Sequence, residues 1–363
     1  MRISGNFNSV IIRTEGLTDQ EIDLVRSIYN ENGKDAMYEY FKTRKVLPFA
    51  AKTFCNLNMD NSFWMPILEE YRDRNTKIVA FLDAAYKALR DYGVKNAFVT
   101  ENFGALLTSG RDIGLFASGD VDNCYDENEK DKLYQALQSI GCTYQEYYSV
   151  KRLNGSAWYA PKEYGLPENF HVGFQPGPLS RWFIPGFVEM CDFNGWDDIR
   201  TYQNTCIQLA DPSVLMYICM LHISLHSFSR APDIRLYTDT LNMTLSNVDY
   251  SKVEAWSKKN HTKTRISVAA TLTNNLMKTD IPKNITNQTN RKNNVLRLVY
   301  DSNANDLIYE PQGLKVLRIE SLCDDKGVAH GLFEIAFPNK EWMRQTYGNN
   351  SIGSYIKHIR RIL

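Results

Sequence analysis

The sequence predicts an α+β fold in which a mixed β-sheet with flanking helices is joined to helical units on both sides along the chain. Apolar residues keep helical spacing up to Gly93, strand-like and helical runs alternate from there to about Gln175, and from Pro212 the pattern is helical again. The 363 residues correspond to roughly two or three structural units at about 150 residues each.

Residues 1 to about 75 are expected to form a helical N-terminal unit. Thr18 and Glu21 have the spacing of a capping box, and Gly33 is expected to end the helix that they begin. Two prolines in the aromatic-rich stretch that follows predict short, interrupted helices. These are Pro48 and Pro66.

Residues 76–200 are expected to form the α/β core. It begins with an amphipathic helix that Gly93 closes, and a second helix with acidic residues at its start stops at Gly141. A segment between the first two strands, around Gly104, predicts a short helix or turn. The expected strands are residues 96–100, 119–125, the two arms of a hairpin around Asn154 and Gly155, and 169–175.

Residues 201–280 are expected to form a second helical unit of four helices. Residues 281–363 are expected to form a connector and a C-terminal segment that packs back on the core. The polar stretch 279–294 predicts an exposed loop, and the tail after Val295 mixes strand-like runs with a final amphipathic YIKHIRRIL.

Composition narrows the class of protein. Lys and Arg number 42 and Asp and Glu number 42, so the chain lacks the basic excess of a dedicated nucleic-acid binder. The seven cysteines are scattered without a C-x-x-C pair, which favours reduced thiols in a cytoplasmic protein. No stretch is apolar enough to predict export or a membrane span.

The sharpest local motif is Ser118-Gly119-Asp120-Val121-Asp122. Residues two apart in a strand face the same side, so the two carboxylates are expected to project together. Carboxylate oxygens suit Mg²⁺ or Mn²⁺, which would also bind substrate phosphates. The alternative is a solvated strand end.

His222 and His226 lie four residues apart on a predicted helix. They have the spacing to bind zinc with a third ligand such as Asp239. The interpretation that the apolar surroundings favour is a packed histidine pair in which His226 bonds a carboxylate such as Asp239.

Aromatic residues between Trp158 and Trp196 are either core residues or the wall of a pocket for a base or an acceptor. Arg200, Arg230 and Arg235 lie near expected helix ends, where solvated or salt-bridged roles are the default and phosphate contact is the alternative. The chain has no P-loop, G-x-G-x-x-G or G-x-S-x-G motif.

The order of motifs resembles the DNA polymerase beta-type nucleotidyltransferase superfamily, and within it an uncharacterised bacterial nucleotidyltransferase family. The resemblance runs from about residue 78 to 363. The motifs that carry it are FVTENFGALL, SGDVDNCYD, NFHVGF, MLHISLHS, RLYTDTLNM, VDYSKVEAWSKKN, FPNKEWMRQTYG and YIKHIRRIL.

The resemblance implies a nucleotidyltransferase-like sheet in which Asp120 and Asp122 are catalytic metal ligands. Ser118 and Gly119 would then form the turn that approaches the triphosphate, and His171 is a candidate acceptor-side base or orienting group. Asn169 stands where the superfamily places a third carboxylate, on the same expected face as His171.

One departure concerns the lysine-glycine turn of the family, which is replaced here by Glu101 and Asn102. Phosphate contacts would then come from Asn102, from the backbone near Gly104 and from Arg111. A glutamate repels phosphate, and an asparagine ligand brings no charge.

Beside a zinc-binding helical protein that would use His222 and His226, two functions are considered. The first is magnesium-dependent transfer of a nucleoside monophosphate from a nucleoside triphosphate to an unidentified acceptor, a small molecule or a protein. The second is a catalytically degraded protein of the same fold that binds a nucleotide or a partner.

Overall fold

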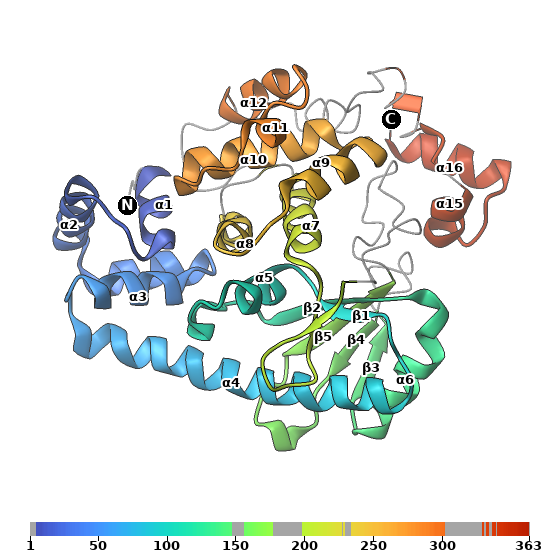
Figure 1. Cartoon of the computed structure of the whole chain (residues 1–363), viewed down its shortest axis with the longest axis horizontal. Coiled ribbons are helices and arrows are strands. Elements are labelled where there is room, and N and C mark those ends of the chain that lie inside the picture. Colours follow the sequence, from blue (N-terminus) through green and yellow to red (C-terminus); the bar gives the residue numbers. More distant parts are fainter. Residues whose placement is uncertain are drawn as a thin grey trace.

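The computed structural model describes residues 5–146, 156–176, 198–226, 228, 234–301, 329, 332–333, 336–338 and 340–362. Within these residues the chain forms a mixed β-sheet surrounded by helices, which confirms the α+β class (Figure 1). The expected turn at Asn154 and Gly155 lies outside the described residues, as do Arg230 and the aromatic residues from Trp182 to Trp196.

The sheet of the described residues has seven strands in the order β3-β4-β5-β2-β1-β7-β6. β2 pairs parallel with β5 and antiparallel with β1, so it lies in the middle of the sheet. β7 is parallel to β1, and the other neighbours are antiparallel. The strands are β1 (Ala97–Val99), β2 (Asp120–Tyr125), β3 (Thr143–Glu146), β4 (Ser156–Tyr159), β5 (His171–Pro176), β6 (Arg200–Thr201) and β7 (Gln208–Leu209).

Two strands, β6 and β7, were not expected from the sequence. Leu209 of β7 pairs with Val99 of β1, so the sheet continues past the expected core boundary at residue 200. Each of these strands has only two residues, too few for an alternating pattern to show.

The two faces of the sheet are covered by different helices (Figure 1). On one face, Tyr86 of α4 (Asn61–Asp91) donates a hydrogen bond to Oδ1 of Asn123 in β2 at 2.9 Å. Side chains alternate along a strand, so Asp120 and Asp122 lie on the opposite face. That face is covered by α5 (Glu101–Ser109), α7 (Pro212–Leu225) and α8 (Arg235–Thr244), which contact one another. α6 (Lys130–Ser139) packs beside α4.

The N-terminal helices are α1 (Gly5–Arg13), α2 (Asp19–Thr43) and α3 (Leu47–Asn56), followed by α4. The capping box at Thr18 and Glu21 is confirmed. Gly33 has φ 78° and ψ 163°, so it breaks the helical backbone of α2 as expected. Pro48 lies in the first turn of α3, where a missing N–H is tolerated.

The expectation that Pro66 interrupts the helix is wrong. Pro66 lies inside α4, which continues to Asp91 and is closed by Gly93 at φ 75°. Pro66 is close to the N-terminal end of α4, where its missing N–H costs one bond near an already unbonded first turn. α4 therefore spans the expected boundary between the N-terminal unit and the core.

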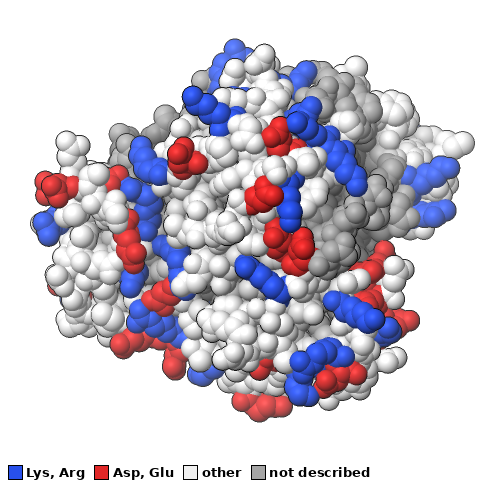
Figure 2. All heavy atoms as spheres, in the orientation of Figure 1, with Lys and Arg blue, Asp and Glu red and all other residues white. Residues whose placement is uncertain are grey.

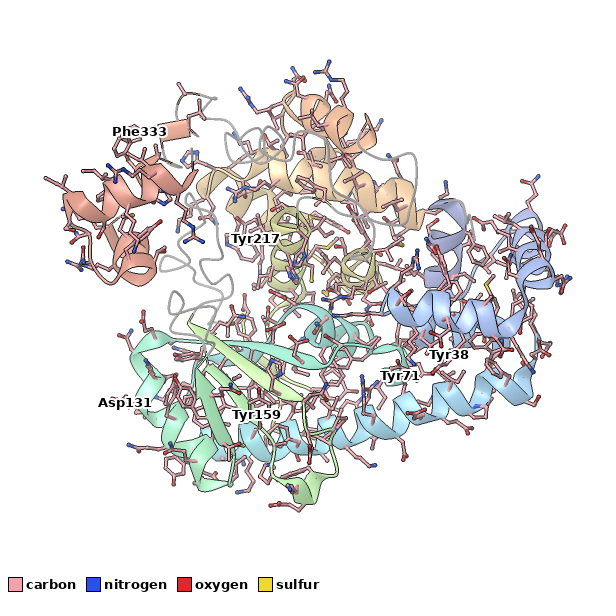
Figure 3. The ribbon with its side chains drawn as sticks, turned by 180° about the vertical axis from the view of Figure 1, so that it is seen from behind. Tyr38, Tyr71, Asp131, Tyr159, Tyr217 and Phe333 are labelled. Carbon is pink, nitrogen blue, oxygen red and sulfur yellow. The ribbon has the colours of Figure 1, made fainter. Side chains whose placement is uncertain are left out.

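The second helical unit is formed by α7, α8, α9 (Tyr250–Lys259) and α10 (Lys263–Met277), as expected. Tyr217 of α7, labelled in Figure 3, is fully buried between these helices. Its hydroxyl lies 3.0 Å from Oγ1 of Thr262 and accepts from Nδ2 of Asn260 at 3.1 Å. The helices of this unit are therefore held to one another by buried polar contacts as well as by apolar packing.

The expectation that residues 279–294 are an exposed loop is wrong in part. Ile281 and Ile285 are buried, and the stretch contains α11 (Lys283–Thr286) and the start of α12 (Lys292–Asp301). Two isolated isoleucines in a polar stretch are sufficient to anchor it.

After α12, the described C-terminal residues include helices α15 (Lys340–Tyr347) and α16 (Ile352–Ile362), and they contain no strand. The final YIKHIRRIL is helical as expected. Across the described part of the chain, none of the helices combines the length and apolarity that a membrane crossing requires.

Candidate functional site

The paired aspartates begin the central strand β2. Asp120 lies opposite His171 of β5 and Asp122 lies opposite Gly173 in a parallel register, so these residues share one face of the sheet. Asp120 and Asp122 are both half-buried. Nε2 of Gln175 donates to Oδ1 of Asp122 at 3.4 Å. The structure thus brings together the two expected carboxylates and the histidine.

The residues before β2 orient the first carboxylate. The buried Ser118 donates from Oγ to Oδ1 of Asp120 at 2.5 Å. Gly119 is exposed, and a Cβ at this position would meet no atom within 4 Å. The backbone at Gly119 is therefore open to the close approach of a ligand.

The first residue of α5 brings a third carboxylate to the aspartates. The N–H of Thr100 donates to the carbonyl of Asp122 at 2.9 Å, which continues the β1–β2 pairing up to the start of α5. Glu101 follows with φ 50°, in the left-handed region that a glutamate rarely adopts. Its Oε2 lies 2.9 Å from Nδ1 of His222 on α7, and each side chain is 12% exposed.

The carboxylates shift one another's protonation. Burial, then the charges of Glu101 and Asp120, raise the pKa of Asp122 well above its ordinary value, against the opposing effect of His222 and Arg235. Burial alone would lower the pKa of His222, but Glu101 and the nearby aspartates raise it overall. The site therefore concentrates negative charge that protons partly neutralise.

Asp239 of α8 belongs to the same charged cluster. Burial raises the pKa of Asp239 to about 7, although His222 and Arg235 oppose this. Its carboxylate is buried, and the histidine whose charge lowers its pKa is His222. The rings of His222 and His226 are in edge contact, with their centroids 4.9 Å apart. The carboxylate that His222 contacts is that of Glu101, which the sequence did not predict as its partner.

The expected metal ligands fit a cation only in part. Across the described residues, no three His, Cys, Asp or Glu side chains are grouped closely enough to hold a metal ion by themselves. Asn169 lies in an exposed turn before β5, where its carbonyl is 3.4 Å from Nδ1 of His171. The zinc site that was considered for His222 and His226 therefore finds no support. Asp120 and Asp122 could offer two carboxylates, and Mg²⁺ commonly takes one or two carboxylates from a protein beside substrate phosphates.

Two of the expected phosphate contacts have other partners. A Cβ at Gly104 would lie 2.6 Å from the carbonyl oxygen of Val99, so this glycine permits α5 to pack against β1. Arg111 donates from Nη1 to Asn242 at 2.8 Å and from Nη2 to Oγ1 of Thr14 at 2.9 Å. It also donates to the carbonyl of Arg13 at 3.2 Å, so its guanidinium links α8 to the end of α1.

A cavity adjoins the aspartates. It encloses about 350 Å³, including the solvent at its mouth, between the start of α5, the residues before β2, α8 and the turn from α2 to α3. Leu106 and Leu115 provide apolar wall. The polar residues that line it are Lys45, Asn102, Ser118, Arg235, Thr238, Asp239 and Asn242.

Comparison with family models, with curated proteins and with solved structures finds no match to this chain. The interpretation of the site therefore rests on its own residues.

Proposed function

We propose that this chain is a magnesium-dependent nucleotidyltransferase with a nucleotidyltransferase-like core, which moves a nucleoside monophosphate from a nucleoside triphosphate to an acceptor. The observation that carries this proposal is the pair Asp120 and Asp122, side by side on the central strand and surrounded by further negative charge. Carboxylates that repel one another in a half-buried site gain stability from a divalent cation.

The donor set fits such an ion. Asp120 and Asp122 would hold it together with phosphate oxygens of the substrate, and a bound magnesium ion would neutralise charge that develops during phosphoryl transfer. Because its Oγ donates to Asp120, Ser118 fixes that carboxylate for binding. Gly119 leaves the backbone open to the substrate.

The role proposed for His171 is on the acceptor side. It lies beside Asp120 on the neighbouring strand β5, and the ring of its cross-strand partner Tyr159 on β4 is 5.7 Å away (Figure 3 labels Tyr159). A histidine beside the carboxylate pair is suited to orient an acceptor or accept its proton. The acceptor, a small molecule or a protein, is not specified by these residues.

Charge on the molecular surface is consistent with a small substrate. On the face shown in Figure 2, the coloured acidic and basic side chains are interspersed and form no extended basic track. A nucleic-acid substrate would favour such a track.

The second candidate, a nucleotide-binding protein without turnover, is favoured by one observation. Glu101, a carboxylate where the resembled family has lysine, lies close enough to raise the pKa of Asp122, and Asn169 adds no charge. A site with two carboxylate ligands and a repelling third can bind a magnesium nucleotide and still lack the charge arrangement for transfer.

The deciding experiment is calorimetric titration of ATP, GTP, CTP and UTP with and without Mg²⁺. Wild type is compared with Asp120→Ala and with the control Asp131→Asn, an exposed aspartate on α6 (Figure 3). We expect magnesium-dependent binding in the wild type and the control and its loss in Asp120→Ala. Equal binding by all three proteins would refute the assignment of the site.

Pyrophosphate release separates the two candidates. When binding is established, release in the presence of an acceptor library indicates transfer, whereas binding without release across the library indicates the degraded protein.

A further inference from the structure

The cavity beside the aspartates is shared by parts of the chain that are far apart in sequence. Ser118 lines the cavity and hydrogen-bonds Asp120, so the cavity opens next to the carboxylate pair. Arg235 also lines it and acts electrostatically on both Asp122 and Asp239. Lys45, from the turn between α2 and α3, brings the N-terminal helices into the same wall.

Two asparagine amides in the wall are held in one orientation. Oδ1 of Asn102 accepts from the N–H of Phe103 at 2.6 Å, and Oδ1 of Asn242 accepts from Nη1 of Arg111 at 2.8 Å. A backbone N–H and a guanidinium can only donate, so the atom that faces each of them must be the amide oxygen. The Nδ2 group of each asparagine is what remains to bind a ligand, and it is a donor.

The cationic side chains of the wall are not tied up in direct contacts, although Arg235 acts at longer range on Asp122 and Asp239. Among the described residues, neither the ammonium of Lys45 nor the guanidinium of Arg235 makes a hydrogen bond or an ion pair within 4 Å. Lys45 is exposed and Arg235 is half-buried. A wall of two cations and two amide donors has the chemistry of a polyphosphate site.

One acidic group, Asp239, lies in this wall. It is buried, and burial raises its pKa to about 7, which reduces the negative charge that it presents to an anion. The two cations outnumber it in the wall.

We propose that this cavity binds the terminal phosphates of a nucleoside triphosphate, with Lys45 and Arg235 as the cations and Asn102 and Asn242 as further donors. This subsite rests on the nucleotidyltransferase function proposed above. It supplies, from α8 and the N-terminal helices, the positive charge that Glu101 does not supply at the start of α5.

The test uses inorganic tripolyphosphate in the presence of EDTA, which probes the subsite without magnesium. We expect Lys45→Gln and Arg235→Gln each to weaken binding about tenfold, because each removes one charge-assisted hydrogen bond. Lys45→Arg keeps the charge and is expected to bind within about twofold of wild type. The matched control is Lys42→Gln, an exposed lysine three residues away that packs on Tyr38 outside the cavity.

Lys45 gives the cleaner of the two results. The charges that act on Asp122 are those of Glu101, Asp120, His222 and Arg235, so Lys45→Gln leaves the carboxylate cluster unchanged. Wild-type protein that does not bind tripolyphosphate, or Lys45→Gln that binds it as tightly as wild type, would overturn the subsite.

The result for magnesium nucleotides separates this subsite from the function on which it rests. If magnesium nucleotide binding depends on Asp120 but not on Lys45, the subsite fails and the proposed function stands. If tripolyphosphate binding depends on Lys45 while Asp120→Ala retains magnesium nucleotide binding, the cavity is a phosphate site and the proposed function fails.

Discussion

Replacing Gly104 by alanine tests how closely α5 must approach the sheet to place Glu101 and Asn102. A Cβ at this position would lie 2.6 Å from the carbonyl oxygen and 3.0 Å from the carbonyl carbon of Val99. Ordinary contact begins near 3.4 Å, so the helix or the strand must move by several tenths of an ångström. Both obstructing atoms are backbone and cannot rotate away.

The expected cost follows from two opposing effects. Overpacking against atoms that cannot move costs about 2–3 kcal/mol, and alanine in a helix regains about 1 kcal/mol relative to glycine. We therefore expect Gly104→Ala to lower the free energy of unfolding by about 1–2 kcal/mol. Urea unfolding, followed by circular dichroism, measures this as a lower midpoint at an unchanged m-value.

Gly119→Ala is the matched control, because a Cβ there meets no atom within 4 Å. Its unfolding midpoint is expected to equal that of wild type, while its affinity for magnesium nucleotide falls if the backbone approaches phosphate there. A Gly104→Ala protein as stable as Gly119→Ala would refute the reasoning about α5.

Three further predictions concern other buried polar groups. Tyr86→Phe removes the donor to Asn123 and leaves a buried acceptor unpaired, so urea unfolding is expected to show a loss of about 1–2 kcal/mol. The Arg72 side chain lowers the pKa of Asp112, although burial opposes this. Asp112→Asn is therefore expected to lower the free energy of unfolding at neutral pH. The loss is expected to be only about 1 kcal/mol, because Arg72 is partly exposed. That stabilisation is lost as the pH falls through the folded pKa of Asp112, and an Asp112→Asn deficit that persists equally at pH 2 would contradict it. Burial raises the pKa of Asp239 to about 7. Above about pH 4 the Asp239 carboxyl therefore keeps its proton in the folded state but has lost it in the unfolded state. The free energy of unfolding is expected to fall as the pH rises from 4 to 7. Asp239→Asn is expected to flatten this fall in thermal unfolding measured across that range, and an unchanged slope would exclude Asp239 as its source.

The sequence predicted the elements whose residue pattern repeats within a few positions, such as β2 and α4. The alternation in β2 and the apolar spacing in α4 are visible within a few residues of each position. β6 and β7 were missed because two residues cannot show a period, and Ile281 and Ile285 were missed because isolated apolar residues do not reveal what they pack against.

In the candidate site, too, the residues of one strand were predicted from the sequence and the contacts between distant elements were not. Asp120 and Asp122 were predicted because strand geometry alone places residues two apart on one face. The contact between Glu101 and His222 joins α5 to α7, and no short motif encodes such a pairing. Glu101 was visible in the sequence as a carboxylate near the aspartates, but only the fold shows that a histidine faces it. Lys45 carried no signal, since the N-terminal helices have no resemblance that marks a binding residue.

The three bonds of Arg111 bear on how the chain can be divided. Its guanidinium connects the end of α1 to α8 through Arg13, Thr14 and Asn242, and burial lowers its pKa. A protein shortened before α2 would lose two of these three acceptors and leave a desolvated positive charge beneath α8. The N-terminal helices are therefore an integral part of the core's architecture, and a fragment that begins at the first strand is expected to be destabilised around α8.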